Sequence, residues 1–73
     1  MRMMALAAEV GVPGNPKAVT LYLNPARIAS VVPWEEDGRE IGSYVFLEDT
    51  DDERYRVHES PDQVAELFER AMQ

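Results

Sequence analysis

The sequence predicts an α+β domain: a small antiparallel sheet of three to four strands, one C-terminal amphipathic helix packed on a face, and an N-terminal arm. Three observations predict it. Apolar residues alternate with other residues between positions 17 and 57, turn residues interrupt that alternation, and a helical apolar stripe ends the chain. With 73 residues, the chain suits one domain with one modest core.

The first sixteen residues lack a clear strand signal. Met, Ala, Leu and Glu within residues 1–10 favour a short helix. The glycines and prolines of residues 11–16 then break any regular structure. We therefore expect residues 1–16 to be a mobile arm or short helix, and residues 17–73 to form a single β-β-β-β-α domain.

The first two expected strands flank an Asn-Pro turn. Val19, Leu21 and Leu23 alternate with neighbours that face the other way, as on a half-buried strand. Asn24-Pro25 ends this strand, because proline donates no ladder hydrogen bond and suits a turn or a first helical position. One tight turn then leads into residues 28–32, an apolar and β-branched second strand that stops before Pro33.

The third and fourth expected strands are separated by acidic residues. Asp37-Gly38 predicts a hairpin turn, because such a turn needs positive φ. The strand that follows, residues 41–47, carries large apolar groups on both faces, which predicts a central position or cover on both sides. After a second acidic turn, residues 54–57 predict an edge-like strand with its arginines on one face and Tyr55 and Val57 on the other.

The last element is an amphipathic helix. Ser60 is a favourable N-cap, Pro61 suits the first helical position, and Gln63 completes a capping box. The apolar residues then fall at i, i+3, i+4 and i+7 on one stripe. These residues, which we expect to pack on one face of the sheet, are Val64, Leu67, Phe68 and Ala71.

Charge excludes several classes of partner. The net charge is -7, and phosphate backbones and acidic membrane surfaces repel such a chain. Residues 35–40 and 48–53 together hold nine acids and one base, a local charge of -8. The chain contains no cysteine, which fits a reducing cytosol. Its N-terminal apolar stretch of six residues is shorter than the roughly 7–15 of a signal peptide. We expect a soluble cytoplasmic protein that binds neither nucleic acid nor membrane.

The second acidic segment resembles a calcium loop only in part. Counted from Asp49, oxygen ligands fall at positions 3 and 5, but position 6 is Arg54 rather than glycine and position 12 is Ser60 rather than glutamate. We expect no metal or other cofactor. The segment is interpreted either as a solvated turn or as a site that attracts a basic partner. The candidate partner-binding residues are Asp49, Asp51, Asp52 and Glu53.

No grouping of residues points to catalysis. His58 is the only histidine, and no serine or aspartate stands at a spacing that would make it a general base. The four glycines are scattered among turns and do not form a phosphate loop. We therefore expect a protein that is not an enzyme.

Aromatic residues are the better candidates for a binding site. Trp34, at a strand end beside an acidic turn, is either a partly exposed anchor for a partner or a cover for one end of the core. Tyr22, Tyr44 and Phe46 could form an apolar sheet face opposite the helix. That face either binds a partner or a second subunit, or lies beneath the N-terminal residues Met3, Met4 and Leu6.

Two stretches resemble the short flagellar FlbD/SwrD family. Leu21-Tyr22-Leu23-Asn24-Pro25-Ala26-Arg27-Ile28 is similar to that family's strand, Asn-Pro turn and second strand. Tyr55-Arg56-Val57-His58-Glu59-Ser60, with Val64 and Leu67, is similar to its last strand and amphipathic helix. The acidic turns and the first sixteen residues depart from the family pattern. The resemblance implies a small sheet-plus-helix shape and a non-enzymatic accessory role.

Two functional hypotheses follow from these features. The first is an acidic protein–protein interaction module, as a monomer or a homo-oligomer, that uses a sheet face or edge. The second is an acidic inhibitor or regulator that occupies a basic, nucleic-acid-binding surface of another protein.

Overall fold

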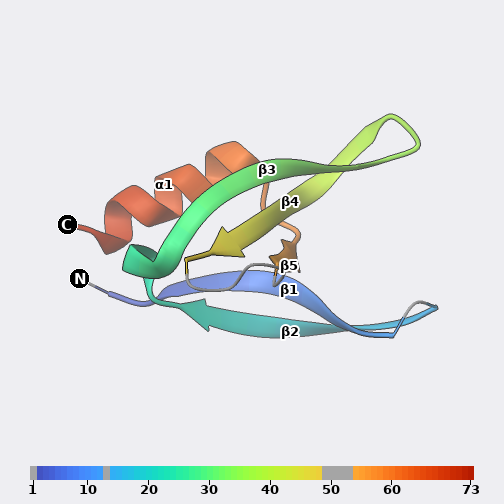
Figure 1. The fold of residues 1–73 in the computed structure, drawn as a ribbon, viewed down its shortest axis with the longest axis horizontal. Helices are drawn as coiled ribbons and strands as arrows, with labels where there is room; N and C mark the ends of the chain where they lie inside the picture. The colour runs from blue at the N-terminus through green and yellow to red at the C-terminus, as the bar shows by residue number, and fades with distance from the viewer. Residues whose placement is uncertain (1, 13, 49–53) are drawn as a thin grey trace.

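In the part of the chain that the structure describes, most residues lie in strands, and one α-helix follows the strands (Figure 1). The computed structural model describes residues 2–12, 14–48 and 54–73. The elements of these residues, in chain order, are β1 (Met4–Val12), β2 (Asn15–Leu23), the 3-10 helix η1 (Pro25–Arg27), β3 (Ile28–Glu36), β4 (Arg39–Leu47), β5 (Arg54–Val57) and α1 (Pro61–Ala71).

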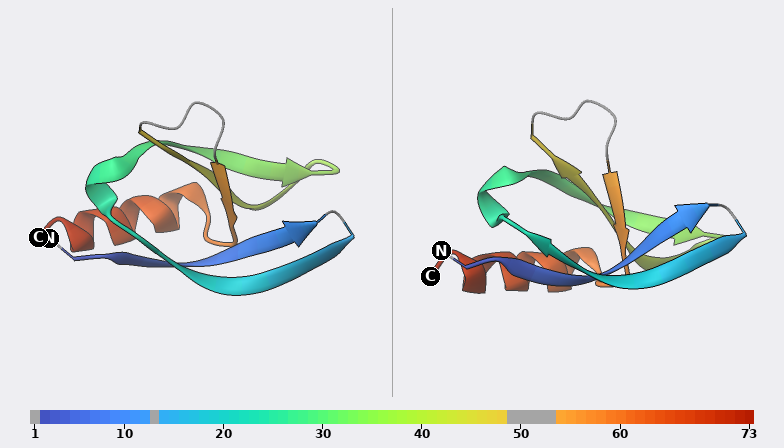
Figure 2. Two further views of the ribbon diagram at one scale, coloured as in Figure 1. Left: turned by 60° about the horizontal axis from the view of Figure 1, so that its bottom comes forward. Right: turned by 90° about the horizontal axis from the view of Figure 1, so that it is seen from below.

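The strands form one antiparallel five-stranded sheet in the order β2-β1-β5-β4-β3. Two long hairpins, β1–β2 and β3–β4, are bridged by the short β5, which pairs with β1 and with β4. Helix α1 contacts β1, β3 and β4, and Figure 2 shows it between the two hairpins, whose far ends extend past it. The predicted α+β class, with a C-terminal helix packed against an antiparallel sheet, is confirmed.

Three expectations about the strands are wrong. The second expected strand, residues 28–32, does not stop before Pro33 but continues through it as β3 to Glu36. Residues 4–12 form a strand rather than an arm or a helix, and they pair with β2 along its whole length. Pairing and burial of Met4, Leu6 and Ala8 on one face outweigh the helix propensity of this segment. Strand β5 is interior rather than edge-like, because β1 occupies the side that a four-stranded sheet would leave open.

The turns follow their sequence signals. Asp37 and Gly38 both have positive φ, at 51° and 76°, as a two-residue hairpin turn of type I′ requires. At the β2–β3 connection, the side chain of Asn24 accepts the Ala26 N–H at 3.0 Å and Pro25 is the first residue of η1. The predicted Asp-Gly hairpin and the tight Asn-Pro turn are both confirmed.

Helix α1 begins where the sequence predicts. Ser60 Oγ accepts the Gln63 N–H at 3.2 Å, and Gln63 Oε1 accepts the Ser60 N–H at 2.8 Å, which completes the capping box. Val64 and Ala71 are buried, and Leu67 and Phe68 pack against the core from half-buried positions. The predicted apolar stripe is confirmed.

The core fills the space between α1 and the sheet face that it covers. It consists of Met4, Leu6, Ala8, Leu23, Val45, Val57, Val64 and Ala71. Strands β1 and β2 continue past the start of α1, so Val10 and Val19 on the same sheet face are exposed. The folded core therefore occupies one end of the molecule, and the hairpin ends project from it.

Candidate functional site: the outer sheet face and the strand edges

The outer face, meaning the sheet face turned away from α1, holds Trp34 in a packed position. Trp34 stands opposite Gly42 in the β3–β4 register, so no cross-strand side chain faces it. The ring centroid lies 5.8 Å from that of Tyr44 and 6.1 Å from that of His58. Trp34 is only 4% exposed, so of the two alternatives the partly exposed anchor is wrong. A role of Trp34 in binding a partner stays a prediction.

Two arginines of β5 lie over these aromatic rings. Arg56 Cζ is 5.4 Å from the ring centroid of Trp34, and Arg54 Cζ is 4.6 Å from that of Tyr44. Such cation–π contacts contribute about 0.5–1 kcal/mol each at exposed sites. Because the guanidinium groups cover the rings, this part of the outer face is an arginine–aromatic layer rather than a bare apolar patch.

The three residues expected to form one apolar face do not lie together. Tyr44 and Phe46 belong to β4 and are half-buried, whereas Tyr22 belongs to β2 and is 65% exposed. Strands β1 and β5 separate β2 from β4, and three strand spacings amount to roughly 14 Å. Met4 and Leu6 are buried in the helix-side core, so they do not cover the outer face.

The acidic candidates of the second turn, Asp49, Asp51, Asp52 and Glu53, lie outside the described residues. The first acidic turn is described, and all of its acids are exposed at the far end of the β3–β4 hairpin: Glu35, Glu36, Asp37 and Glu40. Within residues 2–12, 14–48 and 54–73, no three His, Cys, Asp or Glu side chains gather in a way that could hold a metal ion.

His58 is an exposed residue at the end of β5. Its Nε2 lies 3.7 Å from Glu9 Oε1, on the neighbouring strand β1. Its ring also lies beside Trp34, so the contacts that fix it are a carboxylate and an aromatic ring. This arrangement positions His58 as part of the outer face and brings no hydroxyl nucleophile to it among the contacts described.

The unpaired edge of β2 could not be recognised from the sequence pattern. The Ala7 N–H donates to the carboxylate of Glu59, and the Ala7 carbonyl accepts the His58 N–H at 2.7 Å, so both backbone groups of Ala7 point away from β2. Thr20 stands opposite Ala7 in the β1–β2 register. Opposite residues in antiparallel strands exchange both hydrogen bonds or neither. The N–H and C=O of Thr20 therefore point outward, away from β1.

The same alternation applies along β2, and we call its outward row from Ala18 to Tyr22 the β2 edge. The β1–β2 register is unbroken, so Ala18 and Tyr22 also direct their backbone groups outward. Pro16 falls in this outward row, where proline is tolerated because no ladder bond is lost. Residues 19–23 contain neither a charge nor a proline. The edge is thus protected only at its start, by Pro16 and Lys17.

The opposite edge of the sheet is protected along its length. Strand β3 contains the exposed Pro33, which cannot donate a backbone hydrogen bond. Its register with β4 is interrupted twice, between Ile28 and Ser30 and between Trp34 and Glu35. Bulges, prolines and charges are the features that keep an edge strand from pairing with another chain. The two edges of this sheet therefore differ in their capacity to accept a further strand.

Comparison of the chain with protein-family models, with curated proteins and with solved structures found no match. The resemblance to the FlbD/SwrD family stays a prediction for that reason. Among the described residues, no helix combines the length and the apolar character needed to span a membrane. Because no known protein matches, the interpretation of the candidate site rests on the geometry of the outer face and the strand edges.

Proposed function

We propose that the chain is a small, non-enzymatic protein–protein interaction module with an accessory or regulatory role, and that two copies assemble through the β2 edge. One observation carries this proposal: Thr20 and its neighbours direct free N–H and C=O groups outward from an edge without charges, proline or a bulge. Such an edge is a template for pairing with a strand of another chain.

A twofold antiparallel pairing of two β2 edges is compatible with this geometry. Identical patches meet in a twofold interface, so Thr20 of each copy can stand opposite Tyr22 of the other. Both residues direct their backbone groups outward, and a Thr–Tyr cross-strand pair contributes about 0.2–1 kcal/mol. Tyr22 is 65% exposed in the single chain, so this contact would remove it from solvent.

Light scattering coupled to size-exclusion chromatography tests the proposal. The wild-type chain is expected to elute as a dimer at high protein concentration and to dissociate on dilution. Thr20→Pro removes one outward N–H without touching the β1–β2 ladder, and Tyr22→Lys adds a charge to the edge. Both variants are expected to be monomers with an unchanged far-ultraviolet circular dichroism spectrum.

Val32→Lys is the matched control, because Val32 is an exposed apolar residue on the opposite edge strand β3. It is expected to leave the dimer intact. A wild-type chain that stays monomeric at about 1 mM, a concentration that reveals even weak pairing, contradicts the proposal. So does a folded Thr20→Pro variant that dimerises as well as wild type.

The second hypothesis, an acidic regulator of a basic partner surface, is supported by a different observation. The four acids at the far end of the β3–β4 hairpin are all exposed and project beyond the helix-covered core. Charge of this kind increases association rates with basic surfaces and is screened by salt. A complex that persists unchanged at high salt, or after all four acids are replaced by their amides, would count against this second role.

A further inference from the structure

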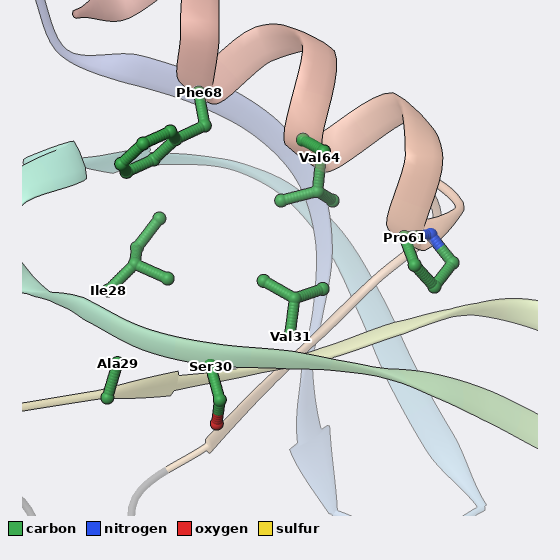
Figure 3. A pocket seen from close by; sticks show the side chains of 8 residues that line it. Ile28, Ala29, Ser30, Val31, Pro61, Val64 and Phe68 are labelled. Carbon is green, nitrogen blue, oxygen red and sulfur yellow. The ribbon is translucent and has the colours of Figure 1, made fainter.

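A pocket lies between α1 and the edge strand β3, apart from the β2 edge (Figure 3). Its volume is about 270 Å³, and it is lined by Ile28, Ala29, Ser30, Val31, Pro61, Val64, Ala65 and Phe68. Figure 3 shows Ile28 and Val31 pointing toward the helix and Phe68 pointing back toward the strand. The walls of the pocket are therefore apolar side chains from two elements.

The bulge in β3 produces this pocket. In a regular strand, residues three positions apart point to opposite faces. The register shift between Ile28 and Ser30 inserts one residue, so Ile28 and Val31 both point toward α1 while Ser30 points away. A short gap is left between the two apolar side chains, and the helix closes it from above with Val64 and Phe68.

The size of the pocket fits a side chain better than a small molecule. Sites that enclose drug-sized ligands measure about 300–1,000 Å³ and bury most of the ligand surface. This pocket falls below that range and is formed at the surface between one helix and one strand. A single large apolar side chain, such as phenylalanine or leucine, is the group that it can accommodate.

The rim of the pocket on the helix side is acidic. Asp62 and Glu69 stand three residues before and four residues after Ala65, so they flank it on the helix surface. Both are exposed, and neither forms an ion pair within the described part of the chain. At the Ile28 end, the Glu48 N–H donates to the Arg27 carbonyl oxygen at 2.7 Å, which places one acid and one base there.

Two alternative occupants fit less well. Addition of a strand to β3 is opposed by the bulge and by Pro33, which lacks an N–H. A second copy of this chain that docked through the same face would set one acidic rim against the other, and like charges across an interface are unfavourable. A basic partner avoids both difficulties. It needs to insert only one side chain, without pairing with β3, and its positive charge complements the acidic rim.

We propose that the pocket between α1 and β3 binds a segment of a partner protein that inserts one large apolar side chain flanked by lysine or arginine residues. Ile28, Val31, Val64 and Phe68 contact the apolar anchor, and Asp62 and Glu69 attract the flanking cations. This surface does not depend on pairing at the β2 edge, so it holds or fails separately from the proposed dimer.

The test uses the full chain and a synthetic peptide with one phenylalanine between two pairs of lysines. Titration by two-dimensional NMR is expected to shift the amide signals of Val31, Ala65 and Phe68, with weak, saturable binding. Replacing the phenylalanine of the peptide by alanine is expected to weaken binding at least about tenfold, since the buried anchor is lost. Replacing the lysines by glutamates is expected to abolish it.

Charge variants of the protein provide matched controls. The double variant Asp62→Asn and Glu69→Gln is expected to weaken peptide binding about fivefold at physiological salt. The variant Glu9→Gln removes a negative charge on strand β1, on the outer sheet face and away from the pocket. It is expected to leave binding unchanged, because charges beyond the Debye length of about 8 Å are screened.

Three results would overturn this inference. The first is no binding of the phenylalanine peptide at about 1 mM, the affinity expected of even a poor single-anchor contact. The second is equal binding of the alanine peptide, which would show a purely electrostatic attraction. The third is that the peptide shifts signals along β2 or at the hairpin ends instead of at the pocket. Pocket signals that shift when the protein is concentrated without peptide would equally contradict the inference, because they would indicate a second copy as the occupant.

Discussion

The carboxylate of Glu59 takes the place of a strand at the end of β5. The Ala7 N–H donates to both of its oxygens, at 3.1 and 3.0 Å, although Glu59 lies beyond the last residue of β5. The four residues of β5 pair with only part of the nine-residue β1, so Ala7 would otherwise lose its N–H partner on that side. The Glu59 carbonyl also accepts the Ser43 Oγ–H at 2.7 Å, which holds β4 against the same turn.

Glu59→Ala is expected to lower the free energy of unfolding by about 1–2 kcal/mol, because a charge-assisted hydrogen bond is lost. Glu59→Gln keeps one acceptor oxygen and is expected to lose less. Both losses can be measured by urea unfolding followed through tryptophan fluorescence, because Trp34 is buried and is the only tryptophan in the sequence. Glu66→Ala is the control: its exposed ion pair with Arg70 predicts a change within about 0.5 kcal/mol. Equal losses at both sites would contradict the assigned role of Glu59.

Gly42 is the position at which β4 tolerates no side chain. A Cβ atom added there would lie 1.9 Å from the Val57 carbonyl oxygen, so β5 would have to move. Gly42→Ala is expected to cost about 3 kcal/mol or more, as overpacking against backbone does. Gly38→Ala meets nothing within 4 Å but has a φ of 76°, which predicts a cost of about 1–2 kcal/mol. A smaller loss at Gly42 than at Gly38, by thermal unfolding, would refute this ranking.

Local signals explain why much of the fold could be predicted. The capping box at Ser60 and the apolar stripe of α1 require only neighbouring residues, as does the positive φ of Asp37-Gly38. Residues 4–12 were different. Their alternation of Met4, Leu6, Ala8 and Val10 has the period of a strand, but the residue types favour a helix, and only pairing with β2 decides between the two.

The candidate sites depend more on contacts between residues distant in the sequence than the turns and the helix do. Tyr22 was recognised from its residue type, but its place on a free edge follows from the pairing of β1 between β2 and β5. The burial of Trp34 depends on the rings of Tyr44 and His58 beside it and on Arg56 from β5. The pocket beside α1 required the bulge at residues 28–30, which no turn residue in the sequence signals.

Ser60 tests the contribution of the capping box to α1. Ser60→Ala removes the acceptor of the Gln63 N–H and is expected to destabilise the domain by about 1 kcal/mol. Because the pocket beside α1 includes Pro61 and Val64 from the first turn, the same variant is expected to broaden their NMR signals. The exposed Ser30→Ala variant, measured by the same urea titration, should stay within about 0.5 kcal/mol of wild type.

Arg56 tests the arginine–aromatic layer on the outer face. Its guanidinium lies over Trp34, so Arg56→Ala is expected to expose the indole ring and to shift its fluorescence emission to longer wavelength. The loss of the cation–π contact and of side-chain packing predicts a destabilisation of about 1 kcal/mol.

Arg54→Ala is the matched comparison for this prediction. Arg54 lies on the same face of β5 but covers Tyr44 instead of Trp34. Its removal is expected to leave the tryptophan emission unchanged, and acrylamide should quench Trp34 more strongly only in the Arg56 variant. If both arginine variants shift the emission equally, Trp34 is shielded by the stability of the whole sheet rather than by the contact with Arg56.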